Sequence, residues 1–189
     1  MAMNRRDAIK SVALLMGGTM VGANAILSGC TPEEQIVGLE FSPKEIAFLD
    51  EIGEAIIPTT DTPGAKATKI GEFIQMMVKD TYNAEQQNTF VEGLNFIRKD
   101  FEASKGKDFM DVTVEQRTAY LNELQSSGKT TIAADPAIIG MILGMLKDLT
   151  VLGYFTSEIG ATQQLRYFEV PGRYDPCIDY TPGERAYAI

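Results

Sequence analysis

The sequence predicts a single all-α domain of about five helices, and three observations support this prediction. Apolar residues recur at spacings of three and four in five successive segments, the period of an α-helix. Capping signals such as Ser42-Pro43 with Glu45, and Asp135-Pro136, stand where helices would begin. No stretch shows the alternation of apolar and polar residues that is typical of a half-buried strand.

Four of the five expected helices begin at a capping residue. The helices start near Ser42, Ile70, Asn83, Thr113 and Asp135. The first four carry one apolar face, whereas the fifth is apolar nearly all round. A helix without a polar face must be buried, so we expect the fifth at the centre of the domain. It is not expected to span a membrane, because Lys147 and Asp148 interrupt it.

Within these helices, charged residues and methionines are expected to have ordinary structural roles. We expect Asp50, Glu51 and Glu54 on a solvated helix face. Methionines on apolar faces are expected to fill the core, namely Met76, Met77, Met141 and Met145. The polar groups of the loop 59–64 either bind a ligand or bond their own backbone. The second interpretation is favoured, because such residues commonly fix turns.

The first thirty residues have the order of an export signal. A basic cluster with Arg5 and Arg6 precedes an apolar run over 11–26, which is too short and too rich in glycine for a spanning helix. The paired arginines resemble a twin-arginine signal, which exports folded proteins. Leu-Ser-Gly-Cys at 27–30 resembles a bacterial lipobox, in which Cys30 is acylated. We therefore expect an export signal over 1–29, a tether over 30–41 and the helical domain over 42–189.

Composition excludes several classes of function. The chain has 17 basic and 26 acidic residues, and without Arg5, Arg6, Lys10 and Asp7 of the leader the net charge is −11. Such a surface repels nucleic acid and anionic lipid, so membrane attachment is expected through acyl chains. The sequence contains no histidine, which excludes imidazole catalysis and histidine metal ligands. We expect no catalytic, cofactor-binding or metal-binding residues in this chain.

The second cysteine, Cys177, has three interpretations. It forms a disulfide with another subunit, it is a quiet buried thiol, or it is a reactive nucleophile. The last is disfavoured because no base stands near it in the sequence. Around it, the segment 154–177 interleaves aromatic residues, glycine, proline and arginine, and it needs a surface to order it. The residues expected to contact a partner are Tyr154, Phe155, Glu158, Arg166, Tyr167, Arg173 and Tyr174.

Three stretches carry a resemblance to a known family. Ala-Ile-Ile-Pro-Thr-Thr-Asp-Thr-Pro-Gly-Ala at 55–65, Tyr-Phe-Thr-Ser-Glu-Ile-Gly at 154–160 and Val-Pro-Gly-Arg-Tyr at 170–174, with Cys177 nearby, resemble the small (gamma) subunit of the gluconate 2-dehydrogenase family. The resemblance covers essentially the whole domain.

The resemblance implies a non-catalytic subunit that accompanies a large flavoprotein of the glucose-methanol-choline type. The flavoprotein holds FAD, oxidises a sugar or sugar acid, and passes electrons to a cytochrome subunit or a quinone. The small subunit is implied to assist the maturation and export of its partner. A lipobox is not general in this family, so Cys30 adds an anchor on the periplasmic side of a bacterial membrane.

Two hypotheses from other classes stand beside this one. The chain could be an independent enzyme or ligand-binding lipoprotein, which the missing histidine and the missing nucleotide motif disfavour. It could also be a structural lipoprotein with no redox partner. The first of these predicts turnover or a ligand-induced shift in melting temperature for the isolated domain, and a flavoprotein gene next to that of this chain would favour the subunit hypothesis over the second.

Overall fold

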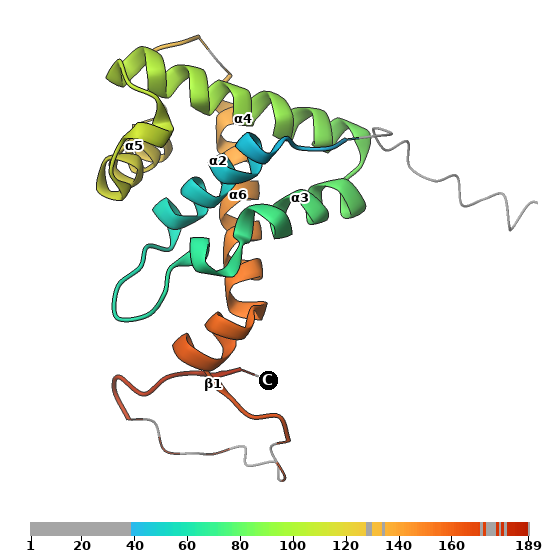
Figure 1. The fold of residues 1–189 in the computed structure, drawn as a ribbon, viewed down its shortest axis with the longest axis vertical. Helices are drawn as coiled ribbons and strands as arrows, with labels where there is room; N and C mark the ends of the chain where they lie inside the picture. The colour runs from blue at the N-terminus through green and yellow to red at the C-terminus, as the bar shows by residue number, and fades with distance from the viewer. Residues whose placement is uncertain are drawn as a thin grey trace, which may run out of the picture. The chain divides into compact units, whose positions relative to one another are not determined.

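The computed structural model describes residues 39–127, 130–133, 135–170, 172, 177, 179 and 181–188. The predicted export signal and lipidation site, with Arg5, Arg6 and Cys30, lie outside these residues, as do Arg173 and Tyr174. Most of the described chain is helical, and its only strands have two residues each, which confirms the predicted all-α class (Figure 1). Its α-helices are α2 (Pro43–Ile56), α3 (Ile70–Thr81), α4 (Ala84–Lys105), α5 (Val114–Ser127) and α6 (Pro136–Thr156).

Three helices, α2, α4 and α6, begin at capping residues that the sequence predicts, namely Ser42, Asn83 and Asp135. The Ser42 hydroxyl accepts the N–H of Glu45, and the Glu45 carboxylate accepts the Ser42 N–H at 2.7 Å, which is a complete capping box. Asn83 and Gln86 form the same reciprocal pair at the start of α4. At its other end α4 stops at Gly106, whose φ of 65° lies in the left-handed region that glycine adopts without strain.

The core gathers around α6, which contacts α2, α3, α4 and α5 (Figure 1). Its buried face presents Ile139, Ile142, Leu146 and Leu149 to the other helices. A second part of the core is aromatic, with rings in edge-to-face contact at centroid distances of 4.9 to 5.0 Å. This chain of rings joins α2, α4, α5 and the short 3-10 helix η2 (Phe109–Asp111), and it consists of Phe48, Phe109, Phe101 and Tyr120.

The central position predicted for α6 is confirmed, but the prediction that it is buried all round is wrong. Met141 is 53% exposed, Leu152 is 45% exposed and Ile138 is 42% exposed. The neighbouring helices cover one side of α6 and leave these residues uncovered. Met76 on α3 is likewise exposed, so the expectation of core methionines is wrong for Met76 and Met141.

The domain begins before Ser42. Phe41 is buried, and its ring meets that of Phe90 edge to face at a centroid distance of 6.1 Å. Leu39 also packs against the core. The predicted tether over 30–41 is therefore wrong for residues 39–41, which belong to the folded domain.

Beyond α6 the chain forms a small structure that we call the flap, residues 160–170 and 181–188. It contains the single π turn η3 (Gly160–Gln164) and two short strands, β1 (Arg166–Tyr167) and β2 (Tyr187–Ala188). The strands pair in parallel, with Arg166 opposite Tyr187. Strands of two residues have no alternation to detect, so the sequence does not predict them. Figure 1 shows the flap at the carboxyl-terminal end of α6.

Replacing Gly160 with alanine is expected to lower the free energy of unfolding by about 1–3 kcal/mol. A Cβ at Gly160 would collide with the carbonyl oxygen of Tyr154 and lie 2.7 Å from its carbonyl carbon, and neither backbone atom can rotate away. Gly144→Ala is the matched control, because a Cβ there meets no described atom within 4 Å. This control is expected to gain about 0.5–1 kcal/mol. Urea unfolding followed by circular dichroism measures the free energy of unfolding of both variants. Equal values would contradict the close contact between Gly160 and the Tyr154 carbonyl group.

Candidate functional site

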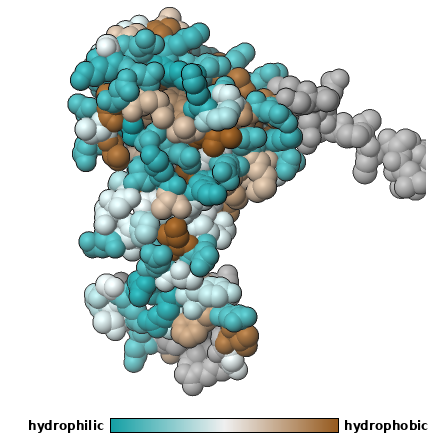
Figure 2. All heavy atoms as spheres, in the orientation of Figure 1, coloured by the Kyte–Doolittle hydropathy of each residue, from teal (hydrophilic) through white to brown (hydrophobic). Residues whose placement is uncertain are grey.

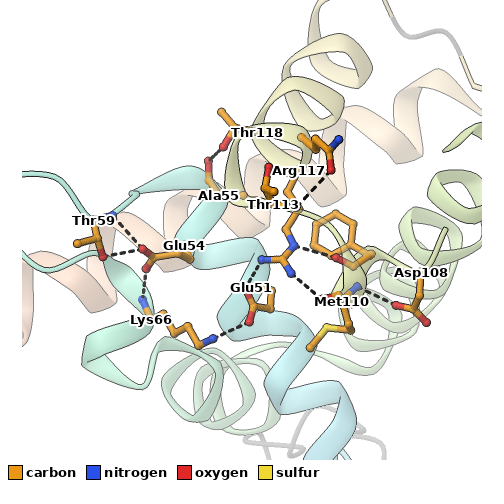
Figure 3. Close-up of polar contacts among 12 residues, drawn as sticks. Glu51, Glu54, Ala55, Thr59, Lys66, Asp108, Met110, Thr113, Arg117 and Thr118 are labelled. Carbon is orange, nitrogen blue, oxygen red and sulfur yellow. Dashed lines mark hydrogen bonds and ion pairs between the residues drawn. The ribbon is translucent and has the colours of Figure 1, made fainter.

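Three carboxylates on α2 form a polar cluster next to the core, and we call Asp50, Glu51 and Glu54 the acidic triad. Glu54 is buried, and the Glu51 side chain is only 12% exposed. The prediction of a solvated helix face is therefore wrong. Each carboxylate accepts hydrogen bonds from residues outside α2, and Figure 3 shows those of Glu51 and Glu54.

Glu54 holds the loop that follows α2. One carboxylate oxygen accepts the N–H and the hydroxyl of Thr59 at 2.9 and 2.7 Å, and the other accepts the N–H of Lys66 at 3.0 Å. The Thr59 hydroxyl oxygen in turn accepts the N–H of Gly64. One buried side chain thus accepts hydrogen bonds from backbone N–H groups at both ends of the loop. Without it, these groups would have no replacement for the hydrogen bonds to water that they lose on folding.

Glu51 joins two cations. It accepts the Lys66 ammonium at 2.6 Å and forms an ion pair with the buried Arg117 guanidinium of α5. Arg117 also donates to the carbonyl oxygens of Phe109 and Met110 at 2.8 and 2.9 Å. This guanidinium therefore ties α2, α5 and η2 together (Figure 3).

Asp50 accepts the N–H of Gly71 at the start of α3, at 2.8 Å. Burial raises the pKa of this carboxyl above its ordinary value, while the Gly71 N–H and the nearby Lys66 charge act in the opposite direction. The carboxylates of Glu72 and Glu51 add to the increase. The folded domain therefore favours the neutral form of Asp50 relative to water.

Replacing Asp50 with asparagine is expected to raise the free energy of unfolding at neutral pH by under about 1 kcal/mol, because the site is only half-buried. The asparagine oxygen can still accept the Gly71 N–H. A carboxyl whose folded pKa is raised stabilises the fold below its unfolded pKa and loses that contribution as pH rises through the folded pKa. The advantage of Asp50→Asn should therefore vanish toward acid. Urea unfolding at several pH values measures the difference in free energy of unfolding between the variant and the wild type. A variant less stable than the wild type at pH 7 would contradict the raised pKa of Asp50.

The loop 59–64 is fixed by its own backbone and by distant side chains. The Tyr154 hydroxyl donates to the Pro63 carbonyl at 2.8 Å, and the Thr62 hydroxyl donates to the Gln164 side chain at 2.8 Å. Thr60 N–H donates to the Thr62 carbonyl at 3.0 Å. These contacts support the predicted structural role of the loop over ligand binding.

The acidic triad and its partners are engaged in holding the fold. Within the described residues, no fully buried side-chain nitrogen or oxygen lacks a hydrogen-bond partner. The same residues contain no group of three or more histidine, cysteine, aspartate or glutamate side chains that could hold a metal ion. The triad therefore has a structural role, in which its carboxylates link α2 to the neighbouring helices and to the loop 59–64.

The residues expected to contact a partner lie in different environments. Tyr154 is buried, so it holds the loop 59–64 and offers no surface. Phe155 is half-buried and Glu158 is exposed. Arg166 and Tyr167 lie in β1 of the flap, and Tyr167 is exposed.

The flap presents an apolar surface around a charged centre. The Arg166 guanidinium lies over the Tyr187 ring at 4.7 Å and forms an ion pair with Glu184. Four large side chains around it are exposed, namely Tyr167, Phe168, Val170 and Tyr187. Figure 2 shows hydrophobic residues at the surface here, beside hydrophilic ones. Cys177 is exposed and forms no disulfide within the described part of the chain, so the interpretation as a buried thiol is wrong.

Sequence reasoning missed Arg117, which links α5 to both α2 and η2. One signal could have revealed it. Arg117 stands three, four and seven residues before Tyr120, Leu121 and Leu124, which places it on the apolar face of α5. A cation on an apolar face requires a buried acceptor, and Glu51 supplies it.

Comparison with known proteins identifies the family. A scan against models of protein families matches residues 43–172 with gluconate 2-dehydrogenase subunit 3. Searches of the curated proteins and of the solved structures give no match. The family match spans more than half of the chain and contains α2 to α6, the acidic triad, the loop 59–64 and β1. The chain therefore belongs to the gluconate 2-dehydrogenase subunit 3 family, whose name denotes a subunit of a dehydrogenase complex.

Proposed function

We propose that this chain is the non-catalytic small subunit of a flavin-dependent dehydrogenase that oxidises a sugar or sugar acid. In this proposal the large partner subunit carries FAD and performs the oxidation. The chain assists the maturation of that subunit, travels with it across the membrane and anchors it on the periplasmic side through acylated Cys30. Electrons leave the flavin for a cytochrome subunit or a quinone.

The acidic triad is the observation that carries this proposal. Its carboxylates are occupied by backbone N–H groups, Lys66 and Arg117, which is typical of a structural role. A general acid or base needs a carboxyl that can reach a substrate, whereas Glu51 and Glu54 are enclosed by these donors. Membership of a subunit family supports the same conclusion.

The flap supplies a surface for the partner. Its exposed aromatic and aliphatic side chains, with the Arg166–Glu184 pair among them, have the composition of a protein interface rather than of a solvated loop.

Exposed Cys177 could form a disulfide with the partner there. Cys177→Ser should then abolish a slower-migrating band on a non-reducing gel of the native membrane fraction, and an unchanged pattern would contradict the cross-link.

Deleting the gene for this chain tests the assistance to the partner. We expect the exported flavoprotein and its dehydrogenase activity to fall together, and the wild-type chain to restore both. Complementation with Arg5→Lys/Arg6→Lys should leave the flavoprotein in the cytoplasm. In this proposal the two arginines direct the chain and its bound flavoprotein to the export pathway for folded proteins. Normal export of active flavoprotein in the deletion strain would contradict the proposed function.

A further inference from the structure

One side of α6 carries a strip of apolar residues that the domain leaves uncovered, and we call it the α6 seam. Its residues follow one another at spacings of three, four, seven and three: Ile138, Met141, Met145, Leu152 and Phe155. Ile138, Met141 and Leu152 are exposed, and the other two are half-buried. Side chains at these spacings lie in line on one helix face, so the seam runs along most of α6.

The spacing of the seam is the one by which helices pack against each other. Ile138, Met145 and Leu152 repeat every seven residues, as do Met141, Asp148 and Phe155. Two glycines, Gly140 and Gly144, lie beside this line, and a Cβ on either would meet no described atom within 4 Å. Small residues beside an apolar line allow another helix to approach closely.

Asp148 occupies the gap in the seam between Met145 and Leu152. Its carboxylate is exposed and has no hydrogen bond or ion pair with any residue that the structure describes. Tyr82 lies near it: burial raises the pKa of the Tyr82 hydroxyl, and the Asp148 charge adds to the increase. A carboxylate in the middle of an apolar strip opposes insertion into lipid, because the charge would lose its hydration there. The same carboxylate would attract a cation on a facing protein.

We propose that the α6 seam is the docking site for an amphipathic helix of the dehydrogenase's catalytic subunit. That helix carries apolar residues at spacings of three and four, and a lysine or arginine opposite Asp148. This inference rests on the proposed function, since it adds to the flap a second surface through which the two subunits meet.

Charge favours this occupant over a second copy of the chain. Each copy has a net charge of −9, so two copies would repel one another. In a parallel pair of α6 helices the two Asp148 carboxylates would also face each other. A partner with a basic residue at this position removes the repulsion and gains an ion pair in a largely apolar interface.

Two variants of the full-length chain test the seam by its binding to the purified flavoprotein subunit. Gly144→Leu places bulk where a facing helix would lie, and we expect the dissociation constant to rise about tenfold or more. The same change should raise the melting temperature of the chain alone, because glycine weakens a helix interior. Met141→Lys should weaken binding similarly. Met76→Lys is its control, since Met76 is 50% exposed on α3 and Met141 is 53% exposed.

Charge variants test the predicted cation. Asp148→Lys should weaken binding more than Asp148→Asn, and the difference should shrink as salt is raised. Equal binding by the wild-type chain, Gly144→Leu and Met141→Lys would overturn the seam as the docking site. If no flavoprotein binds the wild-type chain, the proposed function itself fails.

Two other occupants give distinct results. Light scattering of the chain alone would detect a dimer that Met141→Lys dissociates, which would assign the seam to a second copy and overturn the proposal. Flotation of the Cys30→Ser chain with neutral phospholipid vesicles, abolished by Met141→Lys, would assign the seam to the membrane and likewise overturn it.

Discussion

Replacing Arg117 with methionine is expected to lower the free energy of unfolding by about 3–5 kcal/mol. The change keeps an apolar stem of similar length and removes only the guanidinium. Glu51 would lose one of its two cations, and the carbonyl oxygens of Phe109 and Met110 would lose their donor. Buried acceptors without donors account for most of the expected loss.

Urea unfolding followed by circular dichroism measures this loss. Arg98→Met is the matched control, because the Arg98 guanidinium lies over the Phe48 ring at 4.7 Å and contributes about 0.5–1 kcal/mol as a cation–π contact. The double variant Arg117→Met/Glu51→Gln should lose less than the sum of its two single variants, since both remove the same pair. A loss for Arg117→Met no larger than that for Arg98→Met would contradict its role as the link among α2, α5 and η2.

Replacing Glu54 with alanine is expected to lower the free energy of unfolding by about 2–4 kcal/mol. The N–H groups of Thr59 and Lys66 and the Thr59 hydroxyl would lose their acceptor. The loop 59–64 should then detach from α2, although the Tyr154 hydroxyl still holds the Pro63 carbonyl.

Limited proteolysis with mass spectrometry can separate this local effect from global unfolding. Cleavage within 59–66 should accelerate in Glu54→Ala under conditions where cleavage elsewhere does not change. Glu92→Ala is the control, because Glu92 is exposed on α4. Unchanged cleavage of the loop would mean that Tyr154 and the loop's own backbone hold it without Glu54.

Local signals predicted the helices, whereas contacts between distant residues could not be predicted. The capping boxes at Ser42 and Asn83 each lie within four residues, so the sequence contains the whole motif. Glu51 and Arg117 are 66 residues apart, and the residues next to either one do not indicate that the two side chains form an ion pair. The sequence therefore predicted the start of α2 correctly, whereas its prediction that the acidic side chains of α2 face solvent was wrong.

The fifth helix shows a second limit of sequence reasoning. An apolar side chain that meets the core and one that meets a partner subunit look alike in a sequence. Because α6 is apolar nearly all round, the pattern predicted complete burial, and the structure instead leaves Met141 and Leu152 uncovered. The sequence predicts that the segment 154–177 needs a surface to order it, but the pairing of β1 with β2 cannot be predicted from strands of two residues.

The most direct test of the account is purification of the native chain from its own membranes in a mild detergent. We expect a stoichiometric complex with a large subunit that shows the absorbance of a bound flavin and reduces a dye with a sugar or sugar acid. Recovery of the chain as a lone monomer, with an active flavoprotein exported in its absence, would contradict the account.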